Sequence, residues 1–434
     1  MNTGKTGAPP DSGSNSPFRV HGVDLTDERA AAREIHSIGC DPAALPYLLP
    51  KSRMLTLRIE AVPAFAANLL KQEALAVGAD AVVHRHACTL TIDRSDVLLL
   101  ATPAQFARIV KKLRVQVPTL RAVGVSLETY QRSVAAIAAK VFVARGRTFP
   151  IGERTYLFGV LNATPDSFSD GGLFLSSDAA LRRALEMEKQ GADFIDVGGE
   201  STRPGHQGVE AQEEMDRVLP VIRRIRQESS VPISIDTTKA TVARAAIREG
   251  ADVVNDVWGL RKDPGIAAVV AETGAGLVLM HNRGTEGVPA NGPHRVEEFR
   301  GQTRSRDILE DVVAYLETSI ATALAAGVAE NALVVDPGIG FGVSPEDSMR
   351  MIDCLGMLRS LGRPVLLGPS RKSFIGKVLD LPVERRLMGT AAAVAYGIAR
   401  GADFVRVHDV AEMKEVAKLA DALRAAGCAG GPGR

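Results

Sequence analysis

The sequence predicts an α/β protein, a (β/α)8 barrel over residues 151–434 with an additional N-terminal α+β domain. Two observations predict the barrel. Eight short runs rich in Val, Ile and Leu recur after residue 155, as expected for strands buried on both faces. Segments with helical spacing of apolar residues separate these runs, which is typical of a TIM barrel. An open doubly wound sheet is less favoured, because no G-x-G-x-x-G follows the first run.

The expected barrel strands share length and composition, and each is followed by a polar or glycine-rich turn. They are YLFGVLN (156–162), DFIDVGG (193–199), PISIDT (232–237), DVVNDV (252–257), GLVLMH (276–281), ALVVDPG (332–338), PVLLGPS (364–370) and DFVRVHD (403–409). LRRALEMEKQ (181–190) and TVARAAIREG (241–250) have the spacing of the intervening helices. Gly191, Gly250 and Gly401 are expected to end helices in the left-handed conformation.

The chain before residue 151 divides into two parts. Residues 1–18 are rich in Gly, Pro, Ser and Asn, which predicts a disordered tail, and residues 19–150 predict a small α+β domain of unknown role. Its order of elements resembles a split βαββαβ sandwich. The expected strands are MLTLRI (54–59), AVV (81–83), CTLTI (88–92) and VLLLA (97–101), and the expected helices are PAFAANLLKQEALAV (63–77) and TPAQFARIVKKLRV (102–115).

Composition excludes several classes of protein. The 434 residues are 45% hydrophobic and 24% charged, which excludes wholesale disorder. Lys and Arg number 52 against 51 Asp and Glu, and aromatic residues make up only 4%, so no nucleic-acid partner is expected. The four cysteines form no C-x-x-C, so neither disulfides nor a structural zinc site is expected. No apolar run approaches about 18 residues and no secretory signal is visible, so we expect a cytoplasmic protein without a membrane span.

Polar residues end nearly every expected strand, where barrel enzymes place their sites. They are Asn162, Asp196, Asp236, Asn255, Asp256, His281, Asp336, Ser370-Arg371-Lys372, Arg406 and His408. Carboxylates and an amide suit a flat heterocycle with an amino group and ring N–H groups. The cations suit a phosphate, and the oxygen of Asn162 suits a Mg2+ that keeps its waters. Together they indicate a heterocycle joined to a diphosphate.

At these residues the chain resembles the dihydropteroate synthases over roughly residues 155–425. The segments that carry the resemblance, in order, are LNATPDSFSDGG (161–172), IDVGGESTRPG (195–205), SIDTTK (234–239), VVNDV (253–257), MHNRG (280–284), VVDPGIGFG (334–342), GPSRKSFIG (368–376) and FVRVHDV (404–410). The resemblance implies a transferase of folate biosynthesis that joins p-aminobenzoate to 6-hydroxymethyl-7,8-dihydropterin diphosphate, releasing pyrophosphate. It also implies a sulfonamide target, a Mg2+ cofactor and a homodimer.

The resemblance assigns roles residue by residue. It implies that Asp236, Lys372, Arg203 and His408 are catalytic. The implied pterin site comprises Asp196, Asp236, Asn255, Met280, Asp336 and Lys372. The implied p-aminobenzoate site comprises Phe168, Thr202, Pro204, Phe341 and Ser373. The implied pyrophosphate site comprises Asn162, Thr202, Arg203, Arg406 and His408, with Asn162 also on the metal. We expect an SN1-like substitution, because loss of pyrophosphate leaves a delocalised cation that carboxylates stabilise.

Two departures and two alternatives accompany this interpretation. Val343 follows Phe341-Gly342 where the family often has lysine, and the extension before residue 150 is absent from many members. A pterin-dependent methyltransferase would share the barrel and the pterin pocket. In a non-catalytic pterin-binding paralogue, the N-terminal extension would carry the function of the protein. The intact Asn162, Arg203, Lys372 and His408 weigh against that second alternative.

Overall fold

The computed structural model describes residues 21–23, 25, 28–137, 141–163, 172–200, 208–284 and 307–428. These residues form two compact units, one up to Gly124 and one from Val125 to Gly427. The division lies inside α5 (Pro118–Ile137), earlier than the expected boundary between residues 150 and 151. The expected tail, residues 1–18, lies outside the described residues.

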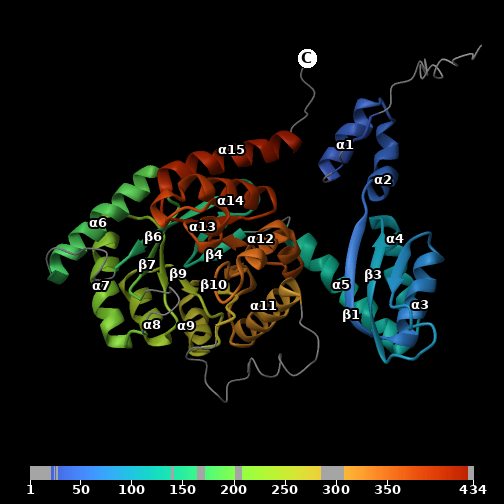
Figure 1. Ribbon diagram of the computed structural model, residues 1–434, viewed down its shortest axis with the longest axis horizontal. Helices are drawn as coiled ribbons and strands as arrows, with labels where there is room; N and C mark the ends of the chain where they lie inside the picture. The colour runs from blue at the N-terminus through green and yellow to red at the C-terminus, as the bar shows by residue number, and fades with distance from the viewer. Residues whose placement is uncertain are drawn as a thin grey trace, which may run out of the picture. The chain divides into compact units, whose positions relative to one another are not determined.

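The second unit contains an eight-stranded parallel sheet in the order β11-β10-β9-β8-β7-β6-β13-β12 (Figure 1). A bridge between Val335 and Val365 joins the two ends of the sheet, so the sheet closes into a barrel. Every strand lies within one of the eight expected runs, which confirms the predicted barrel. The strands are β6 (Tyr156–Asn162), β7 (Phe194–Gly198), β8 (Ile233–Asp236), β9 (Val253–Asp256), β10 (Gly276–Met280), β11 (Leu333–Asp336), β12 (Leu366–Leu367) and β13 (Phe404–Val407).

Helices surround this barrel, as the ribbon in Figure 1 shows. They are α6 (Gly172–Gln190), α7 (Ala211–Glu228), α8 (Ala240–Glu249), α9 (Gly265–Thr273), α11 (Ile308–Ala325), α12 (Pro345–Asp353), α13 (Ser373–Leu379), α14 (Leu387–Ala399) and α15 (Val410–Cys428). Gly250 ends α8 with a φ of 119°, and Gly191 and Gly401 have φ of 98° and 108°. The predicted left-handed helix ends are therefore confirmed.

Side chains inside the barrel form an apolar layer below a polar one. The lower layer belongs to one buried cluster, which includes Phe158, Phe194, Val253, Val278, Val334, Leu366 and Phe404. Side chains of a strand alternate between its two faces, so the residue two positions later points into the same interior. Those later residues are Val160, Asp196, Asn255, Met280, Asp336, Gly368 and Arg406. Five of these seven are polar side chains or a glycine, so the upper barrel is a polar cup.

A hairpin closes the lower end of the barrel. β4 (Val141–Ala144) pairs with β5 (Arg147–Pro150), and both belong to the second unit. The ring of Phe142 lies 5.6 Å from that of Phe404 between centroids, edge to face. A Cβ on Gly276 would lie 2.5 Å from Cζ of Phe142, so the hairpin contacts the start of β10 directly. This packing explains why the hairpin belongs with the barrel and not with the first unit.

The first unit has a three-stranded antiparallel sheet in the order β1-β3-β2. Its elements are α1 (Glu28–Ser37), α2 (Leu45–Leu48), β1 (Leu55–Pro63), α3 (Ala64–Leu75), β2 (Asp80–Val83), β3 (Arg94–Ala101) and α4 (Pro103–Leu113). The side chain of Thr102 caps α4 and forms a capping box with Gln105, at the helix start that the sequence predicts. The other expected helix is observed as α3.

One predicted strand of the first unit is wrong. CTLTI (88–92) forms turns between β2 and β3, so the described residues contain three of the four expected strands, and the expected βαββαβ order is incomplete. The backbone here bonds locally: Ala87 N donates to His84 O and Leu90 N to Ala87 O. Leu90 has a φ of 55° and is exposed, so this segment does not extend along the sheet.

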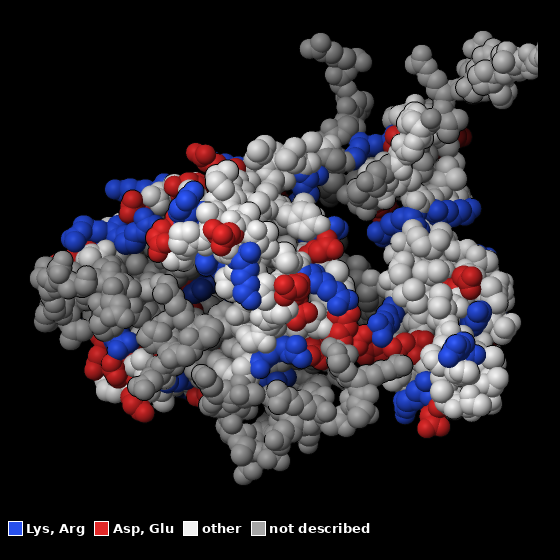
Figure 2. Space-filling model, in the orientation of Figure 1, with Lys and Arg blue, Asp and Glu red and all other residues white. Residues whose placement is uncertain are grey.

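Charge is mixed over the barrel surface. On the face shown in Figure 2, Lys and Arg side chains lie among Asp and Glu side chains over its outer helices. This view agrees with the near balance of 52 basic and 51 acidic residues. Among the described helices, none combines the length and the apolar character that a membrane span requires.

Candidate active site in the cup of the barrel

Arg406 joins two carboxylates at the floor of the cup. Its Nε donates to Asp196 Oδ2 at 2.6 Å, and its Nη2 donates to Asp236 Oδ2 at 2.7 Å. Both carboxylates are buried. Burial opposes the charge of Arg406, but the two carboxylates outweigh this effect and raise the pKa of Arg406. The floor therefore holds a fixed cation between two acids from β7 and β8.

Each of these two carboxylates has one oxygen without a protein partner. Asp196 Oδ1 and Asp236 Oδ1 are buried, and neither accepts a hydrogen bond from the described residues. Asn255 Nδ2 donates to the other oxygen of Asp196 at 3.4 Å. A buried acceptor without a donor costs roughly 1–3 kcal/mol. A ligand with N–H donors at this depth would remove that cost.

Burial shifts the ionisation of Asp236. Desolvation raises its pKa to about 7, while Arg406 opposes the shift and Asp196 adds to it. Asp236 therefore changes charge near neutral pH, and its ionised form, which has two acceptor oxygens and no donor, is the better partner for a donor-rich ligand. A carboxylate with this behaviour in a cleft is typical of a functional site.

Asp336 and Lys372 form the opposite wall of the cup. Burial raises the pKa of Asp336, and the ammonium of Lys372 opposes this rise. Burial also lowers the pKa of Lys372 to about 8, with Asp336 acting in the opposite direction. Lys372 Nζ donates to the carbonyl of Ile339 and lies 4.3 Å from the ring centroid of Phe341. Lys372 therefore lies between a carboxylate and an aromatic face.

The segment after β11 brings Phe341 to this wall. Gly338, Gly340 and Gly342 all have positive φ, between 67° and 78°. A Cβ on Gly338 would overlap the carbonyl oxygen of His281, so only glycine fits there. The N–H of Gly338 donates to Asp336 Oδ1 at 2.7 Å. Phe341 packs beside a buried apolar cluster formed by Val257, Trp258 and Met280, the last of which the family resemblance assigns to the pterin site.

His408 directly follows β13, and Arg371 lies in the turn after β12. His408 Nδ1 lies 2.9 Å from Ser370 Oγ, and His408 N donates to the same hydroxyl at 3.2 Å. Arg371 Nε donates to Asp409 Oδ2 at 3.0 Å, so its charge pairs with a carboxylate of this chain. Arg371 was expected to be one of the cations that bind an anion, and its pairing with Asp409 makes it less suited to that role.

Two expected members of the cup point away from it. Asp256 accepts hydrogen bonds from the N–H groups of Trp258 and Leu260, at 2.9 and 2.6 Å. His281 is buried with its ring 4.9 Å from that of Tyr315 on α11, and burial lowers its pKa to about 3. Each follows an inward-facing residue by one position, so alternation turns it outward. The expectation that all strand-end residues converge is therefore corrected for these two.

Asn162 and Ser373 lie at exposed positions, at the end of β6 and the start of α13. The described residues contain no group of three or more His, Cys, Asp or Glu side chains that could hold a metal ion. A neutral, exposed amide oxygen fits an ion held mainly by water and by a bound phosphate. Four other expected site residues, Phe168, Thr202, Arg203 and Pro204, lie outside the described residues.

Three features of this site are not apparent from the sequence. Arg406 pairs with Asp196 and Asp236, which lie on two other strands, so their spacing in the chain does not indicate the contact. The carbonyl of Ile339 accepts a hydrogen bond from Lys372, and a backbone group leaves no signal in side-chain chemistry. Lys239, the last residue of SIDTTK, contacts Glu200 and Glu214.

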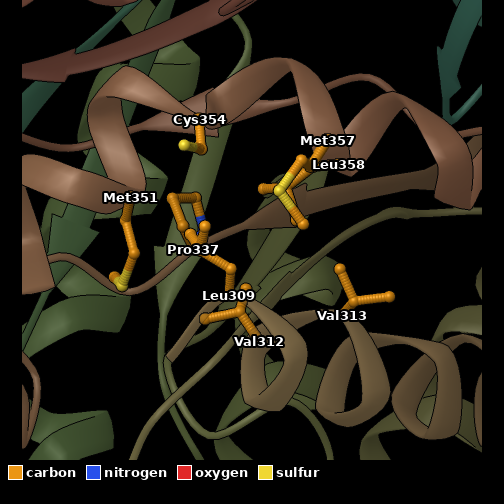
Figure 3. A pocket seen from close by; sticks show the side chains of 8 residues that line it. All are labelled: Leu309, Val312, Val313, Pro337, Met351, Cys354, Met357 and Leu358. Atoms are coloured by element: carbon orange, nitrogen blue, oxygen red, sulfur yellow. The ribbon is translucent and has the colours of Figure 1, made fainter. Parts of the chain in front are cut away.

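An apolar pocket lies outside the barrel and differs from the cup. It is a small, open pocket between α11, α12 and η5 (Leu355–Leu361), and Figure 3 shows the side chains that line it. The lining residues are Leu309, Val312, Val313, Pro337, Met351, Cys354, Met357 and Leu358. This lining holds no charged side chain, so the polar recognition predicted from the sequence belongs to the cup.

The barrel of this chain is similar to known proteins of one family. The family model described as "Pterin binding enzyme" matches residues 158–408, which span the barrel from β6 to the end of β13. The dihydropteroate synthase of Bacillus subtilis is 48% identical over 271 residues, covering 62% of this chain and 89% of that protein. That of Clostridium beijerinckii is 46% identical and covers 64% and 97%.

Solved structures give the same likeness. The dihydropteroate synthase of Clostridium difficile, solved in the presence of pteroic acid, is 46% identical with a TM-score of 0.58. The match covers 63% of this chain and 98% of that one. The enzyme of Xanthomonas albilineans in complex with 7,8-dihydropteroate is 37% identical with a TM-score of 0.57, covering 66% and 99%.

Proposed function

This chain belongs to the pterin-binding enzyme family, and from that premise we propose that it catalyses the dihydropteroate synthase reaction. The amine of p-aminobenzoate would displace pyrophosphate from 6-hydroxymethyl-7,8-dihydropterin diphosphate, giving 7,8-dihydropteroate in folate biosynthesis. The observation that carries this proposal is the pair of unpartnered buried oxygens, Asp196 Oδ1 and Asp236 Oδ1, at the floor of the cup. A pterin presents an amino group and ring N–H groups, which are the donors that these oxygens lack.

The residues of the cup suggest how the reaction proceeds. The C–O bond to pyrophosphate breaks first, and the dihydropterin ring carries the resulting positive charge. Asp236, Asp196 and Asp336 are buried in the cup, where they would surround the ring and stabilise this charge without forming a bond to it. The amine nitrogen then attacks the exocyclic carbon and loses a proton. During these steps Lys372 would contact both substrates, and His408 and Arg203 would hold the departing pyrophosphate.

A Mg2+ ion is part of this proposal, with Asn162 as its protein ligand. When bound, Mg2+ would neutralise charge on the diphosphate. The exposed position of Asn162 at the end of β6 supports a site shared with substrate and water. Phe341 and Ser373, with Phe168, Thr202 and Pro204, would frame p-aminobenzoate. Val343 is half-buried against the barrel core, so its apolar side chain packs where many members of the family carry a lysine.

We also propose that the barrel forms a homodimer. Large apolar side chains are exposed on the neighbouring helices α13, α14 and α15, including Val378, Met388 and Leu419 at 59%, 77% and 62% exposure. Apolar groups that gather on one face are typical of an interface. Sedimentation of the wild type and of Met388→Glu tests this: a wild-type dimer that Met388→Glu dissociates would support it, and a wild-type monomer would contradict it.

The reaction is tested with purified full-length protein. Pterin diphosphate, p-aminobenzoate and Mg2+ should give 7,8-dihydropteroate and pyrophosphate in equal amounts. Binding of the pterin without product would favour the non-catalytic paralogue. Transfer of a methyl group from a methylated folate to a corrinoid would favour the methyltransferase. A cytoplasmic location, and the absence of a nucleic-acid partner, stay predictions of the sequence.

A further inference from the structure

A single lysine bridges two carboxylates beside the cup. Lys239 Nζ lies 2.6 Å from Glu200 Oε2 and 2.5 Å from Glu214 Oε2. The side chain of Glu214 is fully buried, and its second oxygen has no partner among the described residues. A buried carboxylate is stable only when it is paired, so Glu214 depends on Lys239.

The three residues come from three elements that meet at one corner of the barrel. Glu200 follows β7 by two residues, Glu214 lies in the first turn of α7, and Lys239 directly precedes α8. Lys239 is also three positions after Asp236. The ion pair therefore ties the end of β7 to the end of β8 and fixes both against α7.

This corner is packed closely against the floor of the cup. Gly198 is paired in register with Asp236, and a Cβ on Gly198 would lie 3.6 Å from Cβ of Asp236. A Cβ on Gly199 would lie 2.7 Å from Val218 Cγ1 and 3.2 Å from Glu214 Cγ, both on α7. A shift between β7 and β8 at this corner would therefore move Asp236 relative to Asp196.

We propose that Lys239 is a positioning residue for the pterin pocket, which holds the ends of β7 and β8 so that Asp196 and Asp236 keep the spacing that Arg406 spans. Lys239 contacts neither acid of the floor and touches no reacting atom. This inference rests on the proposed function, because it assigns the floor of the cup to the pterin.

Lys239 also affects the charge around Asp236 indirectly, through Glu214. The groups that act on Asp236 are Arg406 from β13, Asp196 from β7, Glu214 from α7, Asp256 from β9 and Lys372 after β12. Glu214 is among those that raise the pKa of Asp236. Lys239 compensates the charge of Glu214, so its removal should raise the pKa of Asp236 further.

The test uses full-length protein and binding of 6-hydroxymethyl-7,8-dihydropterin diphosphate, measured by calorimetry from pH 6 to 9 without p-aminobenzoate. Lys239→Met should weaken binding about tenfold at pH 7, a typical effect for a supporting residue. It should also move the acidic limb of the affinity profile to higher pH. Lys239→Arg should restore both, because it keeps the charge and the reach.

A matched control separates positioning from stability. Arg226 also joins a buried carboxylate, with Nη2 2.7 Å from Asp252 Oδ2, but it lies at the opposite end of the barrel. Arg226→Met should lower the thermal unfolding midpoint without changing the pH profile of binding. If Lys239→Met does not fold, Glu200→Gln serves instead, because Glu214 then keeps its ion pair with Lys239. Glu200→Gln should weaken binding of the pterin diphosphate at every pH.

The outcomes distinguish this inference from the proposed function. A wild type that neither binds nor turns over the pterin diphosphate contradicts the proposed function. A functional wild type, with Lys239→Met binding the pterin at unchanged affinity and pH dependence, overturns only the role of Lys239. The same holds if Glu200→Gln is the variant that folds and its affinity equals that of the wild type.

Discussion

Arg406 Nη2 donates to Asp236 Oδ2 at 2.7 Å, although 170 positions separate the two residues in the chain. The contact spans the barrel from β13 to β8, with Asp196 of β7 bound to the same guanidinium. Arg406 was expected to anchor pyrophosphate, and this contact places its charge at the floor that we assign to the pterin. Arg406 therefore holds the two carboxylates of the floor in place, in addition to the expected role in pyrophosphate binding.

Arg406→Met should lower kcat/KM for the pterin diphosphate at least about 100-fold at pH 7, since an unpaired buried charge costs about 3–5 kcal/mol. Without the guanidinium the pKa of Asp236 rises above about 7, so part of the activity should return as the pH increases. Initial rates from pH 6 to 9 measure this. Arg359→Met, which loses a cation 3.6 Å from the buried Asp403 at the other end of the barrel, is the control. If the initial rates of Arg406→Met changed with pH in parallel with those of the wild type, Arg406 would not control the ionisation of Asp236.

Asp236→Asn should increase stability at alkaline pH while abolishing turnover. The folded-state pKa of Asp236 is raised above its unfolded value. The free energy of unfolding of the wild type is therefore highest below pH 4, near the unfolded pKa of Asp236, where this side chain is neutral in both states. It falls as the pH rises through about 7, because the buried side chain then becomes charged. Asparagine carries no charge, so the difference in thermal midpoint between variant and wild type should grow from pH 5 to pH 8. A constant difference would show that burial does not penalise the charge of Asp236.

Lys372→Ala should lose most turnover, because no other described cation lies beside both Asp336 and Phe341. The pKa of Lys372 is lowered to about 8, so its ammonium loses its proton as the pH rises past that value. Wild-type activity should therefore fall above pH 8. Lys372→Arg should keep any remaining activity at pH 9, because a guanidinium stays charged. Full activity of Lys372→Ala would remove this residue from the site.

Gly338→Ala should destabilise the barrel by about 3 kcal/mol or more, since it combines a strained φ of 72° with overlap of the His281 carbonyl. Gly274→Ala is the control, because Gly274 has a φ of 66° with nothing within 4 Å of the added Cβ. It should cost only about 1 kcal/mol, from backbone strain alone. Thermal unfolding of both variants measures the difference; equal midpoints would contradict the close approach at Gly338.

Removal of residues 1–124 should leave a folded, active barrel, whereas removal of residues 1–150 should not. The longer deletion takes away Phe142 and Phe149, which pack on Phe194 and Phe404 at the lower end of the barrel. Phe142→Ala in the full chain should cost about 3–5 kcal/mol for the same reason. Thermal unfolding and turnover of the three proteins test this. An active, stable protein lacking residues 1–150 would show that the hairpin is dispensable.

The order of amino acids was enough to predict the barrel and much of its cup. Eight buried strands need eight Val-, Ile- and Leu-rich runs, and each such run contains a strand. Alternation along β7, β8, β9 and β11 then turns Asp196, Asp236, Asn255 and Asp336 inward, because the period of a strand is two residues. These properties are local, and local properties are visible in a sequence.

Which of these groups meet depends on how distant parts of the chain fold together. Arg406 reaches Asp196 and Asp236 because closure brings β13 within reach of β7 and β8, and nothing in the spacing along the chain specifies that contact. Packing against the barrel also places the hairpin at 141–150 in the second unit and not in the first. CTLTI has the composition of a strand, yet its backbone bonds within its own turns. Such contacts depend on distances through space, which amino-acid order alone does not fix.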